Sequence, residues 1–197
     1  KIAKYKYVLQ LDDDVFLDKY FFRNLINNIK KNTSIAPVMC YKKSKKSVFY
    51  YSNNWLLNFI HWFIHGFKFG SKKMGTVSKS VLAFGHDNIV YENPIVSSEW
   101  LAGGCILHNK ENLILKNYFP FPGKAYGEDL IHSFFLKQNN ISLLLNKNAI
   151  CYIDEFDSSL YNLEMDYNSK KYYNKLNKLN NFRLYLWVFY KKYFIKK

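Results

Sequence analysis

The sequence predicts an α/β domain in which a mixed sheet is flanked by helices. Short apolar runs at 7–11 and 34–41 are bounded by polar or charged residues, as is typical of strands. Segments at 18–31 and 128–136 instead place apolar residues at helical spacing. The chain has 197 residues, of which 49% are apolar and 19% aromatic. This is enough for one domain with a substantial core, and it excludes a disordered chain.

The chain is strongly basic, with a formal net charge of +14 that comes almost entirely from lysine. Such a charge favours partners that carry phosphates, anionic lipid or nucleic acid. Cys40, Cys105 and Cys151 are odd in number, far apart and in no CxxC pair. This pattern argues against a disulfide scaffold or a zinc site and favours a reducing compartment.

The first apolar run ends in three consecutive carboxylates, Asp12, Asp13 and Asp14. Adjacent carboxylates repel one another, so a cation that neutralises them is an attractive explanation. Oxygen ligands at a strand end suit a hard divalent ion such as Mg²⁺ or Mn²⁺. The alternative is a solvated acidic turn before the helix that Asp18 can cap.

The following elements are predicted from periodicity. A helix is expected from Asp18 to about Lys31, and a strand over 34–41 whose Pro37 indicates an edge or an irregular start. Residues 53–69 predict a helix that is too short to span a membrane and that suits either the core or a membrane interface. Its expected broad apolar face contains Trp55, Leu56, Phe59, Ile60, Phe63, Ile64 and Phe67, with Trp62, His61 and His65 toward the other side.

A second motif begins at Trp100 and contains the diglycine Gly103-Gly104. Adjacent glycines between strand-like pieces permit close approach of a ligand to the backbone, although a tight turn explains them equally well. A strand over 105–108 and a short helix to about Leu115 are expected next.

The third motif is Gly127-Glu128-Asp129, which follows an aromatic loop and begins a helix. Carboxylates at a helix start interact favourably with the helix dipole, but they also suit a general base at the rim of a cleft. Two short strands are expected at 141–145 and 149–153. The tail has a basic, aromatic helical pattern that suits a docking helix or an anionic lipid surface.

The order of these three motifs resembles the catalytic half of family 2 glycosyltransferases, which have the GT-A fold. The resemblance covers roughly residues 5–155. The DXD-type motif of the family matches Leu11-Asp12-Asp13-Asp14-Val15, and its acceptor region matches Glu99-Trp100-Leu101-Ala102-Gly103-Gly104-Cys105. Its ED motif matches Gly127-Glu128-Asp129. It implies a partial GT-A catalytic domain over 1–160 and a helical tail over 161–197. It also implies that the nucleotide-binding units lie upstream of Lys1 and that the fragment alone is inactive.

The resemblance implies a role for each motif in sugar transfer from a nucleotide-diphosphate donor. Asp12, Asp13 and Asp14 would bind the donor, with Asp14 and Asp12 as ligands of Mn²⁺ or Mg²⁺. In inverting members the Asp of the ED motif is the base, which points to Asp129 with Glu128 beside it. Trp100, Gly103 and Gly104 would bind the acceptor. The ring of Trp100 is expected to stack on a sugar face.

The sequence departs from the family pattern at two places. Phe134 and Phe135 occupy the region where many members carry a basic residue after the ED motif. Where many members have a histidine after the next strand, this chain has Asp154 and Glu155. Either Asp154 would then take the place of that histidine as a metal ligand, or Asp14, the phosphates and water alone would coordinate the metal.

The expected acceptor is a glycan or lipid-linked molecule in bacterial-type surface polysaccharide or glycolipid synthesis. The expected location is the cytoplasm, at the inner face of the cell membrane if the tail binds lipid. The alternatives are a non-enzymatic basic module that binds nucleic acid and one that binds a membrane surface. The nucleic-acid alternative lacks an RNP, zinc-finger or helix-turn-helix signature, so no nucleic-acid partner is expected.

Overall fold

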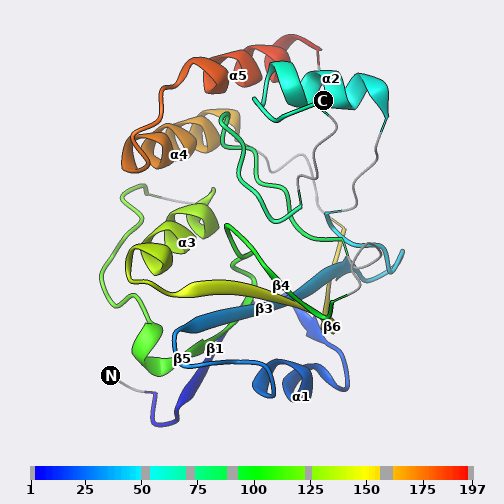
Figure 1. Cartoon of the computed structure of the whole chain (residues 1–197), viewed down its shortest axis with the longest axis vertical. Helices are drawn as coiled ribbons and strands as arrows, with labels where there is room; N and C mark the ends of the chain where they lie inside the picture. Colours follow the sequence, from blue (N-terminus) through cyan, green and yellow to red (C-terminus); the bar gives the residue numbers. More distant parts are fainter. Residues whose placement is uncertain are drawn as a thin grey trace.

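The computed structural model describes residues 3–49, 54–69, 74–87, 93–122, 126–155 and 162–194. These residues form a mixed six-stranded sheet with helices against it, which confirms the predicted α/β class (Figure 1). The strands are β1 Tyr7–Leu11, β2 Phe16–Leu17, β3 Thr33–Tyr41, β4 Ile95–Ser97, β5 Cys105–Asn109 and β6 Ser142–Ile153. The helices are α1 Phe21–Ile26, α2 Trp55–Phe63, the 3₁₀ turn η1 Lys110–Asn112, α3 Glu128–Gln138, α4 Leu163–Leu176 and α5 Phe182–Phe194.

The sheet has the strand order β1-β5-β3-β6-β2, and β4 pairs with the first part of β6. β5 is antiparallel to both of its neighbours, β1 and β3, whereas β3 and β6 are parallel. Among the described strands, β1 pairs only with β5, so it lies at an edge and its residues are half-buried or exposed. The strand predicted at 7–11 is therefore confirmed as a strand, but its burial is less than a core strand would have.

The strand β3 differs from the expectation that Pro37 marks an edge. It lies in the middle of the sheet between β5 and β6, and nearly all of its residues are buried. The pairing with β6 shifts register between Pro37 and Val38. A central strand tolerates proline where the ladder is already interrupted by a bulge, because no ladder hydrogen bond is lost there.

The two strands predicted at 141–145 and 149–153 are one long strand, β6. The polar residues between them, which resembled a turn, lie within the irregularity opposite Pro37. There the side-chain oxygen of Asn146 accepts a hydrogen bond from the backbone N–H of Asn148 (2.9 Å), and its amide nitrogen donates to the carbonyl of Asn24 (2.8 Å). These hydrogen bonds, one within β6 and one to α1, satisfy the side chain of Asn146 inside the continuous strand.

Hydrophobic residues pack on both faces of the sheet. On one face Phe21 and Leu25 of α1 pack with Ile35, whereas on the other face Leu136 of α3 packs with Ala36. Ile35 and Ala36 are adjacent in β3, so their side chains point to opposite faces. Figure 1 shows α1 and α3 on the two sides of the sheet accordingly. The helix predicted from Asp18 to Lys31 is present but shorter, because α1 covers only Phe21–Ile26.

The helix α2 is present within the predicted segment, but most of the face expected to be buried is exposed; Ile64 is buried as expected. Asn54 caps it by accepting a hydrogen bond from the backbone N–H of Leu57 (2.8 Å). His61 and His65 are buried, although they were expected on the polar side. The exposed side chains of α2 are instead large and apolar: Trp55, Leu56, Phe59, Trp62 and Phe63.

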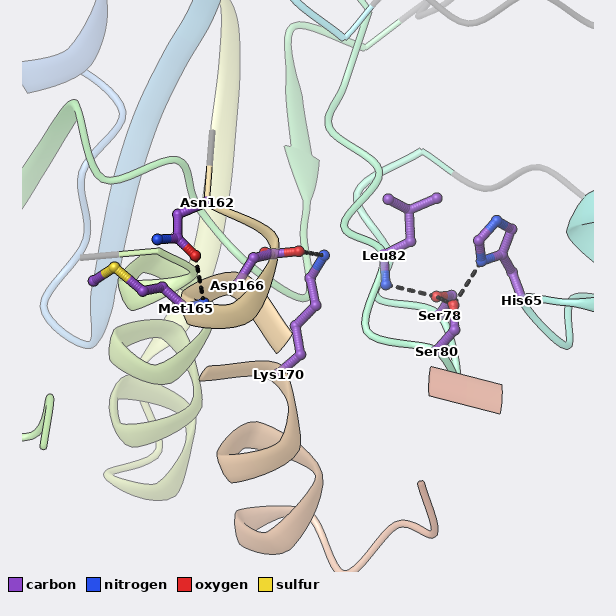
Figure 2. A network of polar contacts seen from close by, with 8 residues as sticks. All are labelled: His65, Ser78, Ser80, Leu82, Asn162, Met165, Asp166 and Lys170. Atoms are coloured by element: carbon purple, nitrogen blue, oxygen red, sulfur yellow. Dashed lines mark hydrogen bonds and ion pairs between the residues drawn. The ribbon is translucent and has the colours of Figure 1, made fainter. Parts of the chain in front are cut away.

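Polar contacts account for the burial of His65 (Figure 2). Its Nδ1 is hydrogen-bonded to the hydroxyl of Ser80 (2.6 Å), which in turn bonds to the hydroxyl of Ser78 (2.9 Å). Burial lowers the pKa of His65 to about 3, so the ring is neutral at physiological pH. A neutral histidine with a hydrogen-bond partner is compatible with the interior, and this network fixes α2 against residues 78–82.

The predicted tail helix is two helices, α4 and α5, separated at residues 177–181. Asn162 caps α4 through the backbone N–H of Met165 (3.0 Å), and Lys170 forms an ion pair with Asp166 (2.9 Å, Figure 2). Together with α2 these helices form a layer on the side of α3 away from the sheet (Figure 1). In the part of the chain that the structure describes, no helix combines the length and apolarity that crossing a membrane requires.

Candidate active site

The acidic motif and the diglycine are joined at the end of β1 and the start of β5. The backbone N–H of Asp12 donates to the carbonyl of Gly104 (3.0 Å), continuing the antiparallel pairing of Leu11 with Cys105. Beside it, the side-chain amide of Gln10 donates to the carbonyl of Gly103 (2.9 Å). These two contacts bring together segments that are more than ninety residues apart.

The lack of a side chain at Gly103 lets the ED motif approach the same point. A Cβ at Gly103 would lie 2.6 Å from Oδ1 of Asp129, and a Cβ at Gly104 would lie 3.1 Å from Oδ2 of Asp12. Distances below 3.0 Å are not tolerated without movement, so a glycine is required at position 103 for this arrangement. All three motifs therefore meet around the diglycine.

The electrostatics of Asp129 suit a base. It lies in the first turn of α3 after Gly127, whose φ of +66° is in the left-handed region that favours glycine. Desolvation raises the pKa of Asp129 to about 6, and the negative charges of Glu128 and Asp12 act in the same direction. A hydrogen bond from the backbone of Gly103 opposes this rise. The carboxylate is thus ionised at neutral pH, yet more basic than an ordinary aspartate.

Glu128 is held by a residue that the sequence did not single out. The hydroxyl of Tyr118 donates to Oε1 of Glu128 (3.0 Å), and the pKa of Tyr118 is raised by burial and by that carboxylate. The ring of Tyr118 stacks on His132 one turn further along α3, at a centroid distance of 5.1 Å. The aromatic loop therefore orients the first carboxylate of the ED motif.

Asp12, Asp13 and Asp14 are exposed at the rim of this region. Burial first, and then the charges of Asp14 and Asp13, raise the pKa of Asp12. A divalent cation would relieve this repulsion, and the oxygen-only donors fit a hard ion such as Mg²⁺ or Mn²⁺. Among the described residues, no three or more His, Cys, Asp or Glu side chains are grouped to hold a metal, so water or substrate oxygens would have to complete the coordination.

Trp100 lies in the interior and not on the surface where a sugar could stack. Its side chain is only 6% exposed, its Nε1 donates to the carbonyl of Phe84 (3.1 Å), and the ring of Phe49 packs edge-on at 5.4 Å. The stacking role expected for Trp100 therefore has no geometric support. Its position instead supports the loop that leads to the diglycine.

The same loop is fixed from α3. The hydroxyl of Ser133 accepts a hydrogen bond from the backbone N–H of Leu101 (3.0 Å), two residues before Gly103. Ser133 and Gln10 could have been found as polar residues inside otherwise apolar patterns, next to a motif. Tyr118 gave no such signal, because its partner depends on how the loop folds back onto α3.

No family model matches the chain, and no curated protein matches it.

Proposed function

We propose that this chain is the metal- and acceptor-binding part of a glycosyltransferase of the family 2 type, with GT-A architecture. In this proposal it transfers a sugar from a nucleotide-diphosphate donor to a hydroxyl group of a glycan or lipid-linked acceptor, with inversion. The observation that carries the proposal is the meeting of Asp12, the diglycine at 103–104 and Asp129 at one point. A solvated acidic turn and a helix-dipole pair would have no reason to converge on the same two glycines.

The residues present supply the chemistry that such a transfer needs. An acceptor hydroxyl must lose its proton as it attacks the anomeric carbon, and Asp129 has the raised pKa and ionised state of a general base. Glu128, held by Tyr118, would bind another hydroxyl of the acceptor or of the donor sugar.

The departing diphosphate carries negative charge that must be stabilised. Asp12 and Asp14 would hold a Mg²⁺ or Mn²⁺ ion, which supplies Lewis-acid stabilisation to that leaving group. Asp13 would contribute to donor binding. The site itself is therefore acidic, whereas the chain as a whole is basic.

The position of β1 at the edge of the sheet is compatible with the proposal. The acidic motif follows an edge strand, β1, whose outer edge has no partner among the described residues. Strands that bind the nucleotide base, which the resemblance places upstream, would have an edge on which to continue the sheet.

Ligand protection of the full-length protein tests this function. UDP or GDP together with Mn²⁺ should raise the melting temperature, and neither component alone should do so to the same extent. Asp14→Asn should abolish this protection because the substitution removes a metal ligand. Asp18→Asn is the matched control, since Asp18 is an acidic residue outside the motif.

Two results would contradict the proposed function. One is the lack of any metal-dependent protection by a nucleoside diphosphate. The other is equal protection of the Asp14→Asn variant and the parent protein. Salt-sensitive binding of RNA or DNA without a nucleotide effect would instead favour the nucleic-acid alternative.

A further inference from the structure

The helices α2 and α5 form one unit at the outer side of the helical layer (Figure 1). Nη1 of Arg183 donates to the carbonyls at the C-terminal end of α2, those of Trp62, Phe63 and Ile64. The ring of Trp187 packs against His65 at a centroid distance of 4.8 Å. A cation at a helix C-terminus also interacts favourably with the helix dipole. The two helices are therefore coupled although some 120 residues separate them.

Each helix turns a row of large apolar side chains to the outside. On α5, the residues that contact the rest of the protein include Arg183, Leu184 and Trp187. Ten of the nineteen exposed large hydrophobic side chains in the described residues belong to these two helices: Trp55, Leu56, Phe59, Trp62, Phe63, Phe182, Tyr185, Phe189, Tyr193 and Phe194. We call these ten residues the α2–α5 face. A water-soluble surface rarely exposes so many grouped aromatic residues without a partner.

Charge is distributed unevenly along the chain in a way that favours this face. The sequence contains no Asp or Glu between Asp18 and Asp87, and none after Asp166. Neither α2 nor α5 contains an Asp or Glu, and α5 carries Arg183, Lys191 and Lys192. On α5 itself, Lys192 is exposed and lies over the ring of Tyr193 at 5.4 Å. The helix α5 therefore combines apolar and cationic groups and has no carboxylate of its own.

We propose that the α2–α5 face binds the surface of an anionic lipid bilayer. Tryptophan and tyrosine rings favour the level of the lipid headgroups, phenylalanine and leucine enter the acyl boundary, and lysines attract anionic headgroups. Helices of nine and thirteen residues lie in the interface and do not cross it. A symmetric contact with a second copy is disfavoured, because it would bring the same basic segments against each other.

This inference does not depend on the proposed function, but the two are compatible. A Cβ at Gly127, next to the ED motif, would lie 3.1 Å from the hydroxyl of Ser169 in α4, and α4 in turn packs against α5. The helix α4 therefore lies between α5 and the start of the ED motif.

Vesicle flotation of the full-length protein tests the proposal. The protein should float with vesicles of phosphatidylcholine and phosphatidylglycerol, but not with phosphatidylcholine alone. Raising the salt to 0.5 M should reduce binding several-fold, because the Debye length falls from ~10 Å at 0.1 M to ~4 Å. The double variants Trp55→Ser/Phe59→Ser and Phe189→Ser/Tyr193→Ser should each lose about tenfold or more in partition coefficient. Lys192→Glu should weaken binding about fivefold.

Matched variants in α1 and in the two residues before it control for general loss of apolar or cationic surface. Tyr20→Ser/Phe22→Ser removes two exposed aromatic side chains, and Lys19→Glu reverses one exposed charge, both away from the α2–α5 face. These variants should bind as the parent does. Circular dichroism and thermal melts establish that each variant is folded.

Tryptophan fluorescence provides a second measurement that does not need substitutions in the core. Trp55 and Trp62 are 71% and 48% exposed, so a lipid-dependent blue shift and quenching by brominated lipid should be reduced in Trp55→Phe and lost in Trp55→Phe/Trp62→Phe. The proposal is overturned if the parent does not bind anionic vesicles, or if the α1 controls lose as much binding as the α2 and α5 variants. It is also overturned if the α2–α5 face variants instead abolish a dimer that forms without lipid, as measured by light scattering.

Discussion

The contact between Gly103 and Asp129 is the tightest in the candidate site. A Cβ at Gly103 would lie 2.6 Å from Oδ1 and 3.2 Å from Cγ of Asp129, so the carboxylate could no longer occupy its position. The side chain can rotate away, because it is partly exposed and surrounded by other negative charges. We therefore expect Gly103→Ala to reduce transfer at least tenfold while changing the free energy of unfolding by less than about 2 kcal/mol.

Gly85→Ala is the informative comparison for that variant. Its Cβ would lie 2.2 Å from Cγ of Phe49, whose ring is already packed against Trp100. A ring atom in a packed cluster cannot move as a carboxylate can, so overpacking should cost about 1–3 kcal/mol. Urea denaturation and donor turnover measured on both variants separate the two effects. A larger loss of stability in Gly103→Ala than in Gly85→Ala would contradict the assignment of Gly103 to the site.

At the level of the elements, Arg183 is the main polar link between α2 and α5. It donates to the carbonyls of Trp62, Phe63 and Ile64 at the C-terminal end of α2, where helix carbonyls run out of intrahelical partners; the carbonyl of Trp62 also accepts from the backbone N–H of Gly66 (3.1 Å). Arg183→Ala should lower the free energy of unfolding by about 1–3 kcal/mol and should speed hydrogen exchange in both helices. Arg183→Lys should recover part of this loss, because lysine keeps the charge but not the planar fork.

Hydrogen exchange followed by mass spectrometry measures this coupling directly. Peptides of α1 and β3 serve as internal controls, since α1 lies at the end of the molecule away from α2 and α5 and β3 lies in the middle of the sheet (Figure 1). Faster exchange in α5 alone, with α2 unchanged, would contradict the view that the two helices form one unit.

The elements that were predicted well are those with strong local signals. The apolar run before Asp12 and the glycine before Glu128 identified β1 and the start of α3, and these motifs provided the acidic residues of the site. The orientation of α2 could not be predicted, because it depends on distant partners of its histidines, such as Ser80 and Trp187. For the same reason β6 seemed to be two strands, since the contacts of Asn146 with Asn24 are non-local. Tyr118 was missed as a site residue because its partner, Glu128, is likewise set by the fold, whereas Gln10 carried a local signal as a polar residue in an apolar run.

Taken as a whole, the molecule has four buried histidines whose pKa values are lowered by desolvation. The values fall to about 3 for His65 and about 4 for His86 and His108, and His132 shifts in the same direction. Between these values and the ordinary pKa of about 6.5, the unfolded chain binds more protons than the folded protein. Stability should therefore be complete above pH 7 and decrease as the pH falls from about 6.5 to 4.

Asp129 opposes this trend, because its raised pKa lets the folded protein bind a proton between about pH 6 and pH 4. Four histidines outweigh one aspartate, each histidine contributing up to about 1.4 kcal/mol per pH unit. Urea denaturation at pH 7.5, 6.0 and 5.0 measures the slope, and His65→Gln should make it shallower. Stability that is constant or increases from pH 7 to pH 5 would contradict the burial of these rings.

The central claim, that Asp129 is the base of a sugar-transfer site, is tested most directly by the transfer rate of Asp129→Asn in the full-length protein. The amide keeps the size of the side chain beside Gly103 but cannot accept the acceptor proton. The account predicts that turnover falls by about a thousandfold or more, while metal-dependent protection by the nucleoside diphosphate stays within about twofold of the parent. Turnover that remains close to that of the parent protein would contradict the account.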